Sequence, residues 1–97
     1  MTVEWSDYAR GRLREIIQEI AYERGCAVAR KWKARLEDST SLLASLPQIG
    51  GEVREIGRED IREIGIPPYR VIYRVLPSRC IVVDVLHSRQ SLASDSF

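Results

Sequence analysis

The chain has 97 residues, the size of one small domain, and we expect a single domain over residues 1–97. Apolar residues make up 44% and charged residues 30%, a balance typical of a folded globular protein and not of a disordered chain. The formal net charge of +1 gives no overall basic field that would indicate nucleic-acid binding. No apolar run reaches the length of a membrane span, and the first residues do not resemble a secretion signal, so we expect a cytoplasmic protein without membrane contact.

The first half of the chain predicts a short strand and two helices. Residues 2–5 alternate as in a strand, and Ser6 is a good N-cap for a helix whose apolar residues follow at spacings of three and four. Gly25 fits the end of that helix. A second helix is expected from about residue 26 to residue 45. The short turn between the helices favours an antiparallel hairpin.

The second half predicts strands. Residues 51–60 are polar and are compatible with either a loop or a weak edge strand. From there the apolar period becomes two, which predicts strands over residues 60–66, 68–76 and 80–86. Their short links favour a mostly antiparallel sheet. The expected fold is therefore α+β, in the order β-α-α-β-β-β, with the helix hairpin packed on one face of a small sheet and a flexible tail over residues 90–97.

Strand alternation assigns side chains to the two faces of this sheet. Arg70 and Arg74 share one side of their strand, opposite Tyr69, Val71, Tyr73 and Val75. In the last strand, Ile81, Val83 and Val85 are uniformly apolar and are expected to face the helices, with His87 on the same side. This places Arg70, Arg74, Asp84 and Glu63 on an uncovered face. That face is either an anion-binding surface or a set of cross-strand ion pairs, each contributing about 0.2–1 kcal/mol.

Other residues carry weaker signals. Trp32 lies in the basic run ARKWKAR, and it fits either the core or a binding surface; the run itself fits either a solvated helix face or a docking stripe for an acidic partner or nucleic acid. His87 and Arg89 follow the last strand, where an imidazole fits either a structural role or general acid–base work. The sequence has no glycine-rich phosphate loop or nucleophile elbow. Cys26 and Cys80 lack the spacing of metal ligands, so we expect neither a metal nor a cofactor.

Several segments together resemble a known family. They are the opening VEWSDYA, the helical segment that ends in LLASLPQIG, the hairpin IREIGIPPYRVIYRV and the closing IVVDVLHSRQ. In this order the chain resembles toxins of the RelE/ParE superfamily, from type II toxin–antitoxin (plasmid stabilisation) modules, and most of all the ParE-like members. The resemblance implies a small cytoplasmic toxin held inactive in a heteromeric complex with an antitoxin, which wraps the toxin with an amphipathic helix and often an added strand.

The resemblance implies two alternative activities. RelE-like members cleave messenger RNA on the ribosome, and ParE-like members poison DNA gyrase. Arg70 stands where the RelE-like strand arginine is expected, and Arg89 and His87 would join it if the chain were such a nuclease. The loop over residues 48–60 mixes acids with its arginines, and no tyrosine follows Arg89, so a gyrase-directed toxin is favoured. The messenger RNA endoribonuclease and a non-toxic binding module remain alternatives.

Candidate partner-binding residues follow from the resemblance together with the assignment of the strand arginines to one face of the sheet. They are Arg70, Arg74, Arg62 and Trp32.

Overall fold

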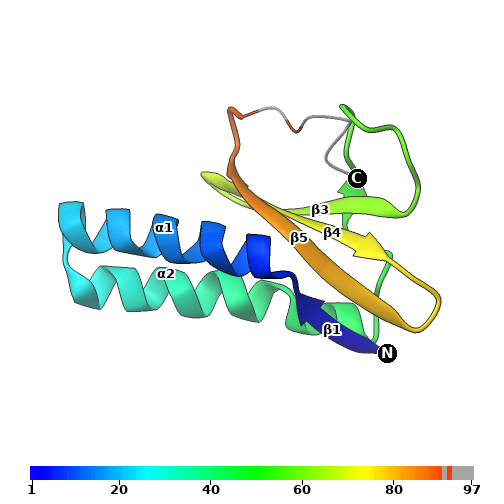
Figure 1. Cartoon of the computed structure of the whole chain (residues 1–97), viewed down its shortest axis with the longest axis horizontal. Coiled ribbons are helices and arrows are strands. Elements are labelled where there is room, and N and C mark those ends of the chain that lie inside the picture. The colour runs from blue at the N-terminus through cyan, green and yellow to red at the C-terminus, as the bar shows by residue number, and fades with distance from the viewer. Residues whose placement is uncertain (91, 93–97) are drawn as a thin grey trace.

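A computed structural model of the chain describes residues 1–90 and residue 92. Two helices form a hairpin that packs against one face of a five-stranded sheet and extends beyond it (Figure 1). The elements are β1 (Thr2–Trp5), α1 (Asp7–Arg24), α2 (Cys26–Ser39), the 3₁₀ helix η1 (Ser41–Ala44), β2 (Gly51–Glu52), β3 (Ile61–Ile66), β4 (Tyr69–Val75) and β5 (Arg79–His87). The predicted α+β fold and its element order are confirmed.

The strands lie in the order β1-β5-β4-β3-β2. The pairs β2–β3, β3–β4 and β4–β5 are antiparallel, and only β1 runs parallel to its neighbour β5. The sheet is therefore mostly antiparallel, as predicted. β2 contributes two residues at one edge, so the ambiguous segment 51–60 begins as a weak edge strand and continues as a loop.

The ends of α1 lie where the sequence predicts them. The Ser6 side chain accepts a hydrogen bond of 3.0 Å from the Ala9 amide, which satisfies one of the free N–H groups of the first turn. Gly25 ends the helix with φ of 93°, a conformation that costs glycine little because it has no Cβ. Its amide donates to the Ala21 carbonyl. The turn directs α2 back along α1.

α2 is shorter than predicted, because it ends at Ser39 and not near residue 45. The hydroxyl groups of Ser39, Thr40 and Ser41 each donate to the carbonyl oxygen three residues earlier. Such local bonds compete with the helical pattern, and the chain tightens into η1. The apolar period continues through both elements, which is why the sequence did not show the break.

The space between the helices and the sheet holds the larger of two apolar clusters, called here the helix-side core. Its buried members are Ala9, Leu13, Ile16, Ile20, Ala29, Leu36, Leu43, Val71, Tyr73, Cys80, Val82 and Val85. The Tyr73 hydroxyl donates to the Pro47 carbonyl at 2.8 Å and accepts from the Gly50 amide at 2.8 Å. This buried side chain therefore fixes the loop that leads from η1 to the sheet.

The predicted faces of β5 are partly wrong. A β-bulge lies where Ile72 pairs with Asp84 but the next residue, Tyr73, pairs with Val82. The extra residue, Val83, shifts the alternation by one position. Consequently Cys80 and Val82 face the helices in place of Ile81 and Val83, while Val85 and His87 face them as predicted.

The face of the sheet away from the helices is not uncovered, in contrast to the prediction. The residues that follow β2 fold over it and form a second cluster, called here the loop-side core: Val53, Ile61, Ile72, Leu86 and Leu92, all buried. Leu92 falls within the predicted tail and is 5% exposed. Residues 91 and 93–97 of that tail lie outside the described residues.

Candidate partner-binding site

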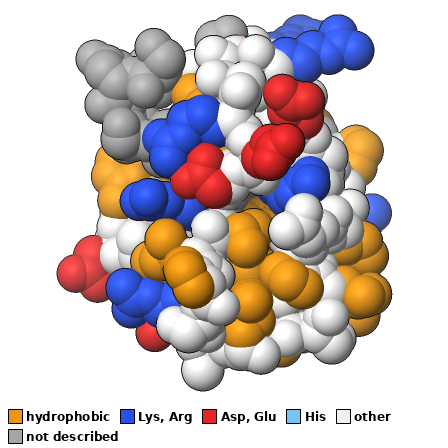
Figure 2. All heavy atoms as spheres, turned by 90° about the vertical axis from the view of Figure 1, so that its right-hand side faces the viewer, with side chains coloured by type: hydrophobic (Ala, Val, Ile, Leu, Met, Phe, Trp, Pro, Cys, Tyr) orange, Lys and Arg blue, Asp and Glu red, His pale blue; other side chains and the backbone are white. Residues whose placement is uncertain are grey.

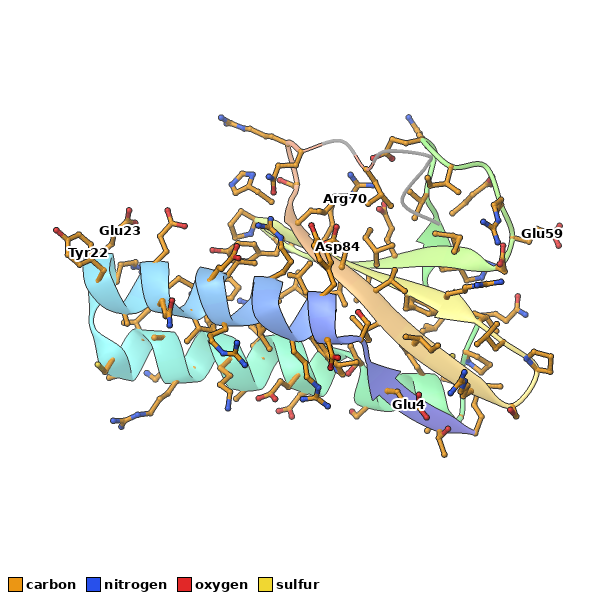
Figure 3. The ribbon with its side chains drawn as sticks, in the orientation of Figure 1. Glu4, Tyr22, Glu23, Glu59, Arg70 and Asp84 are labelled. Atoms are coloured by element: carbon orange, nitrogen blue, oxygen red, sulfur yellow. The ribbon has the colours of Figure 1, made fainter. Side chains whose placement is uncertain are left out.

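Arg70 is the centre of a network of charges beside the loop-side core. From β4 it reaches Glu55 in the covering loop with two hydrogen bonds of 2.9 Å, and Glu63 on β3 with one hydrogen bond of 2.7 Å and an ion-pair contact of 2.6 Å. It also donates to the Gln90 carbonyl at 3.0 Å. The arginine lies on the side of the sheet away from the helices (Figure 3), as predicted, and the Arg70–Glu63 ion pair is the predicted cross-strand contact.

Charged hydrogen bonds between Arg70 and the two glutamates stabilise this network. Hydrogen bonds from Arg70 lower the pKa of Glu55 to about 2, and hydrogen bonds to Glu55 and Glu63 raise the pKa of Arg70. Glu55 also accepts from the Leu92 amide at 3.1 Å. The Arg70 side chain is only 14% exposed. Two carboxylates thus occupy the guanidinium, and the same contacts fix the segment that follows β5.

Arg74, the second arginine on this face, is more accessible. Its side chain is 44% exposed and pairs at 3.2 Å with Asp60, not with Glu63 or Asp84. Asp60 also binds Arg58, at 2.6 Å, and the hydrogen bond from Arg58 is the main cause that lowers the pKa of Asp60. Two arginines therefore share the carboxylate of Asp60.

Asp84 is absent from this face, which corrects the prediction that grouped it with the strand arginines. The β-bulge turns it toward α1, where its carboxylate lies 3.6 Å from Nε of Arg12 (Figure 3). The side chain is 9% exposed, and burial raises the pKa of Asp84, opposed by a hydrogen bond from the Val85 amide and by the charge of Arg12. Asp84 is thus a buried anchor between β5 and α1.

His87 and Trp32 lie on the helix side and are joined through Tyr69. The rings of Trp32 and Tyr69 meet edge to face at 5.4 Å, and those of Tyr69 and His87 at 6.1 Å. Trp32 is half-buried against the helix-side core, and the guanidinium of Arg35 covers its ring at 5.0 Å. His87 accepts from the Arg89 amide at 3.3 Å through Nδ1. The structure therefore separates His87 from Arg70 by the thickness of the sheet.

The remaining candidates lie apart from this group. Arg62 donates to the Gly50 carbonyl and to the Gln48 side chain, each at 3.0 Å, so it fastens the loop before β2. Arg89 is exposed in the turn after β5. The six predicted site residues therefore do not converge on one catalytic centre.

An exposed apolar surface, called here the η1 shelf, was not predicted. It consists of Leu42, Leu46 and Ile49, which are 53%, 51% and 52% exposed. Figure 2 faces this end of the molecule and shows hydrophobic side chains gathered below a band of charged ones. The second helix was predicted to continue to about residue 45, but α2 ends at Ser39. The residues that follow form η1 and a loop, which only the structure reveals.

A groove of about 270 Å³ lies where the η1 shelf meets the edge of the sheet. Leu42 and Ile49 line one side, and Ile64 and Gly65 of β3 line the other. β2 pairs only with Arg62 and Glu63. The outer edge of β3 beyond Glu63 is thus without a strand partner within residues 1–90 and 92.

Comparison with known proteins agrees with this architecture. The family described as "ParE toxin of type II toxin-antitoxin system, parDE" matches residues 3–92. A solved structure entitled "Chromosomal ParDE TA system from P. aeruginosa" superposes with a TM-score of 0.78 at 18% sequence identity, covering 90% of this chain and 95% of that chain. No curated protein sequence matches the chain significantly. In the part of the chain that the structure describes, neither helix has the length and hydropathy needed to cross a bilayer.

Proposed function

Because the chain belongs to the ParE toxin family of type II toxin–antitoxin systems, we propose that it inhibits growth by poisoning DNA gyrase and is neutralised by a cognate antitoxin. The family match over residues 3–92 is the observation that carries this proposal. Its target, and the complex that neutralises it, lie in the cytoplasm.

The environment of Arg70 supports gyrase as the target in preference to messenger RNA. A nuclease of the RelE-like kind would use this arginine to stabilise phosphate charge. Here Glu55 and Glu63 already occupy the guanidinium, and an incoming phosphate would have to displace both carboxylates. His87 lies on the opposite side of the sheet, so it does not face the same substrate atom.

The η1 shelf and the adjoining edge of β3 support antitoxin binding. An extended segment can add to a free strand edge through main-chain hydrogen bonds while its apolar side chains occupy neighbouring pockets. The groove lined by Leu42, Ile49 and Ile64 provides such a pocket beside the free edge. Arg74 and Trp32 stay in the proposal as further contacts, because both retain exposed surface.

The direct test measures supercoiling of relaxed plasmid by purified gyrase, with and without the full chain. We expect supercoiling to be lost and to return when the antitoxin encoded beside the toxin gene is added. Unchanged supercoiling, together with codon-linked cleavage of messenger RNA on ribosomes, would mean that the protein is a messenger RNA endoribonuclease and not a gyrase poison. If cells grow normally after induction of soluble, folded protein, the chain is not a toxin, and a non-toxic binding module is the remaining alternative.

A further inference from the structure

The outer face of α2 carries the exposed cations of the run ARKWKAR, which the proposed function does not use. α2 lies along the lower side of the molecule in Figure 1, with no other described element below it. The helix contains two acids and four cations, and it therefore has a net charge of +2, whereas the rest of the chain has a net charge of −1. The four exposed cations are Arg30, Lys31, Lys33 and Arg35.

Acidic side chains leave most of this charge uncompensated. Within residues 1–90 and 92, no carboxylate oxygen lies within 4.0 Å of a charged nitrogen of Arg30, Lys31 or Arg35. Lys33 is 3.8 Å from Glu37, and both side chains of that pair are widely exposed. The outer face of α2 is therefore a local positive surface, although the whole chain has a net charge of only +1.

The order of the charges along α2 destabilises the helix itself. The helix dipole favours acids in the first turn and cations in the last turn. The first turn of α2 contains no acid, and the last turn contains the two acids and no cation. Like charges also stand on the same face, because Arg30 is three residues from Lys33 and Lys31 is four residues from Arg35. A solvated face that served stability alone would favour the opposite arrangement.

The side chains between these cations are small. Ala27 and Ala34 are exposed and lie three or four residues from Arg30 and Lys31, on the same face of the helix. A helix that binds a membrane surface buries bulky apolar side chains among the headgroups, and a surface that binds a partner helix needs an apolar groove. The outer face of α2 offers neither, so its charge is its main means of binding.

Aromatic rings do not accompany the cations on this face. Proteins that bind single-stranded nucleic acid stack its bases on exposed aromatic side chains. Trp32 is half-buried, with its ring against Tyr69 and beneath the guanidinium of Arg35. Tyr22 is 93% exposed, but it lies on the edge of α1 that is turned away from α2 (Figure 3). A double strand fits better, because it hides its bases and presents its phosphates.

We propose that the outer face of α2 binds the phosphate backbone of duplex DNA. The choice of DNA rests on the proposed function, because duplex DNA is what gyrase acts on, and the toxin would contact the DNA that its target holds. The guanidinium groups of Arg30 and Arg35 suit phosphate oxygens, which they bind through two parallel hydrogen bonds. Lys33 lines a groove of about 250 Å³ with Arg10 and Arg14 of α1, so the positive surface continues onto α1.

Fluorescence anisotropy with a labelled 20-base-pair duplex and the full chain, in the absence of gyrase, tests this contact. Each cation that neutralises a phosphate releases counterions, so affinity falls as salt rises. For the three cations without an acidic partner we expect a log–log slope of about −3, or roughly 40-fold weaker binding at 200 mM than at 50 mM NaCl. No binding at 50 mM NaCl, or a slope that is nearly flat, would overturn the proposal, and the supercoiling assay would decide the proposed function separately.

The variant Arg30→Gln/Lys31→Gln removes two cations from the face and relieves both pairs of like charges. We expect binding to weaken at least tenfold at 50 mM NaCl and the slope to fall by about two. Arg54→Gln/Arg89→Gln removes the same charge at exposed positions outside the helices and should change affinity less than threefold. An equal loss in both variants would mean that net charge, and not the face of α2, attracts DNA, and would overturn the proposal.

The variant Lys31→Glu separates binding from folding. It places a carboxylate four residues before Arg35, the spacing and order that stabilise a helix. We therefore expect a higher urea midpoint together with at least tenfold weaker binding of the duplex, a combination that misfolding cannot produce. Unchanged affinity would overturn the proposal. Tighter binding of a single strand of the same length, or of vesicles of phosphatidylcholine and phosphatidylserine, would assign the face to another ligand and would also overturn it.

Discussion

Among the residues that the structure describes, twelve buried residues from both helices, η1 and the strands close the face of the sheet beneath the helices, whereas five close the opposite face. The five depend on a loop and on Leu92, which Arg70 and Glu55 hold in place through charged hydrogen bonds. Apolar burial does not change with pH, but an ion-pair network loses its contribution when a carboxylate is protonated. The loop-side core should therefore be the weaker region and the one that opens first.

The largest effect is expected on the helix-side core, where Tyr73 meets the loop from η1. A Cβ added at Gly50 would lie 2.6 Å from the Tyr73 hydroxyl and 2.7 Å from the Glu63 carbonyl oxygen. Neither neighbour can move without disturbing the sheet, so Gly50→Ala should cost about 3 kcal/mol through overpacking and loss of the buried hydrogen bond. Urea denaturation followed by circular dichroism measures this loss.

The adjacent glycine provides a matched control. A Cβ at Gly51 meets no atom of residues 1–90 or 92 within 4 Å, and the φ angle of Gly51 is not positive. Gly51→Ala should therefore be neutral or stabilise by up to about 1 kcal/mol, because alanine reduces the freedom of the unfolded chain. If the two variants unfold at the same urea concentration, the close approach at Gly50 does not constrain this loop.

A smaller effect is expected from breaking the network on the other face. Arg70→Ala leaves Glu55 and Glu63 side by side without their cation and removes the contact to Gln90. We expect a loss of about 2 kcal/mol, less than for a fully buried pair because both acids retain some exposure. Limited proteolysis should also cut the segment after β5 faster in this variant.

Arg74→Ala is the control on the same strand and face. Arg74 pairs with Asp60 and its side chain is 44% exposed, so its loss should cost less than about 1 kcal/mol. Proteolysis after β5 should remain at the wild-type rate. Equal destabilisation by the two substitutions would show that Arg70 does not organise the C-terminal segment.

Local patterns in the sequence were sufficient to predict most of the fold. Ser6 and Gly25 mark the ends of α1 by capping chemistry, and alternation identified β3, β4 and β5 with the correct faces for Arg70 and Tyr73. What failed depends on non-local geometry. The bulge beside Val83 follows from how β5 pairs with β4, and no residue type in β5 announces it.

The candidate site was less predictable than the fold. The Arg70–Glu63 pair follows from strand spacing, but Glu55 comes from a loop whose path over the sheet has no periodic signal. Val53 and Ile56, apolar residues three apart in an otherwise polar loop, were a signal that this segment packs against something. The η1 shelf was hidden because the apolar period of α2 continues through η1, beyond the end of the helix.

The smallest effect, a pH dependence, distinguishes the two faces most directly. Glu55 has a pKa of about 2 in the folded protein, below its ordinary value of 4.5, so its ion pair stabilises the fold fully above pH 4.5 and loses this contribution as the pH falls toward 2. Glu55→Gln should lower the free energy of unfolding by about 1 kcal/mol at pH 7. In urea midpoints measured between pH 2.5 and 7, it should also reduce the decrease at low pH, called here the acid limb. Glu59→Gln, on an exposed side chain of the same loop (Figure 3), should leave the acid limb unchanged. An acid limb of equal steepness in wild type and Glu55→Gln would mean that the loop-side core is held by its five apolar residues, and that the contrast between the two faces is one of size alone.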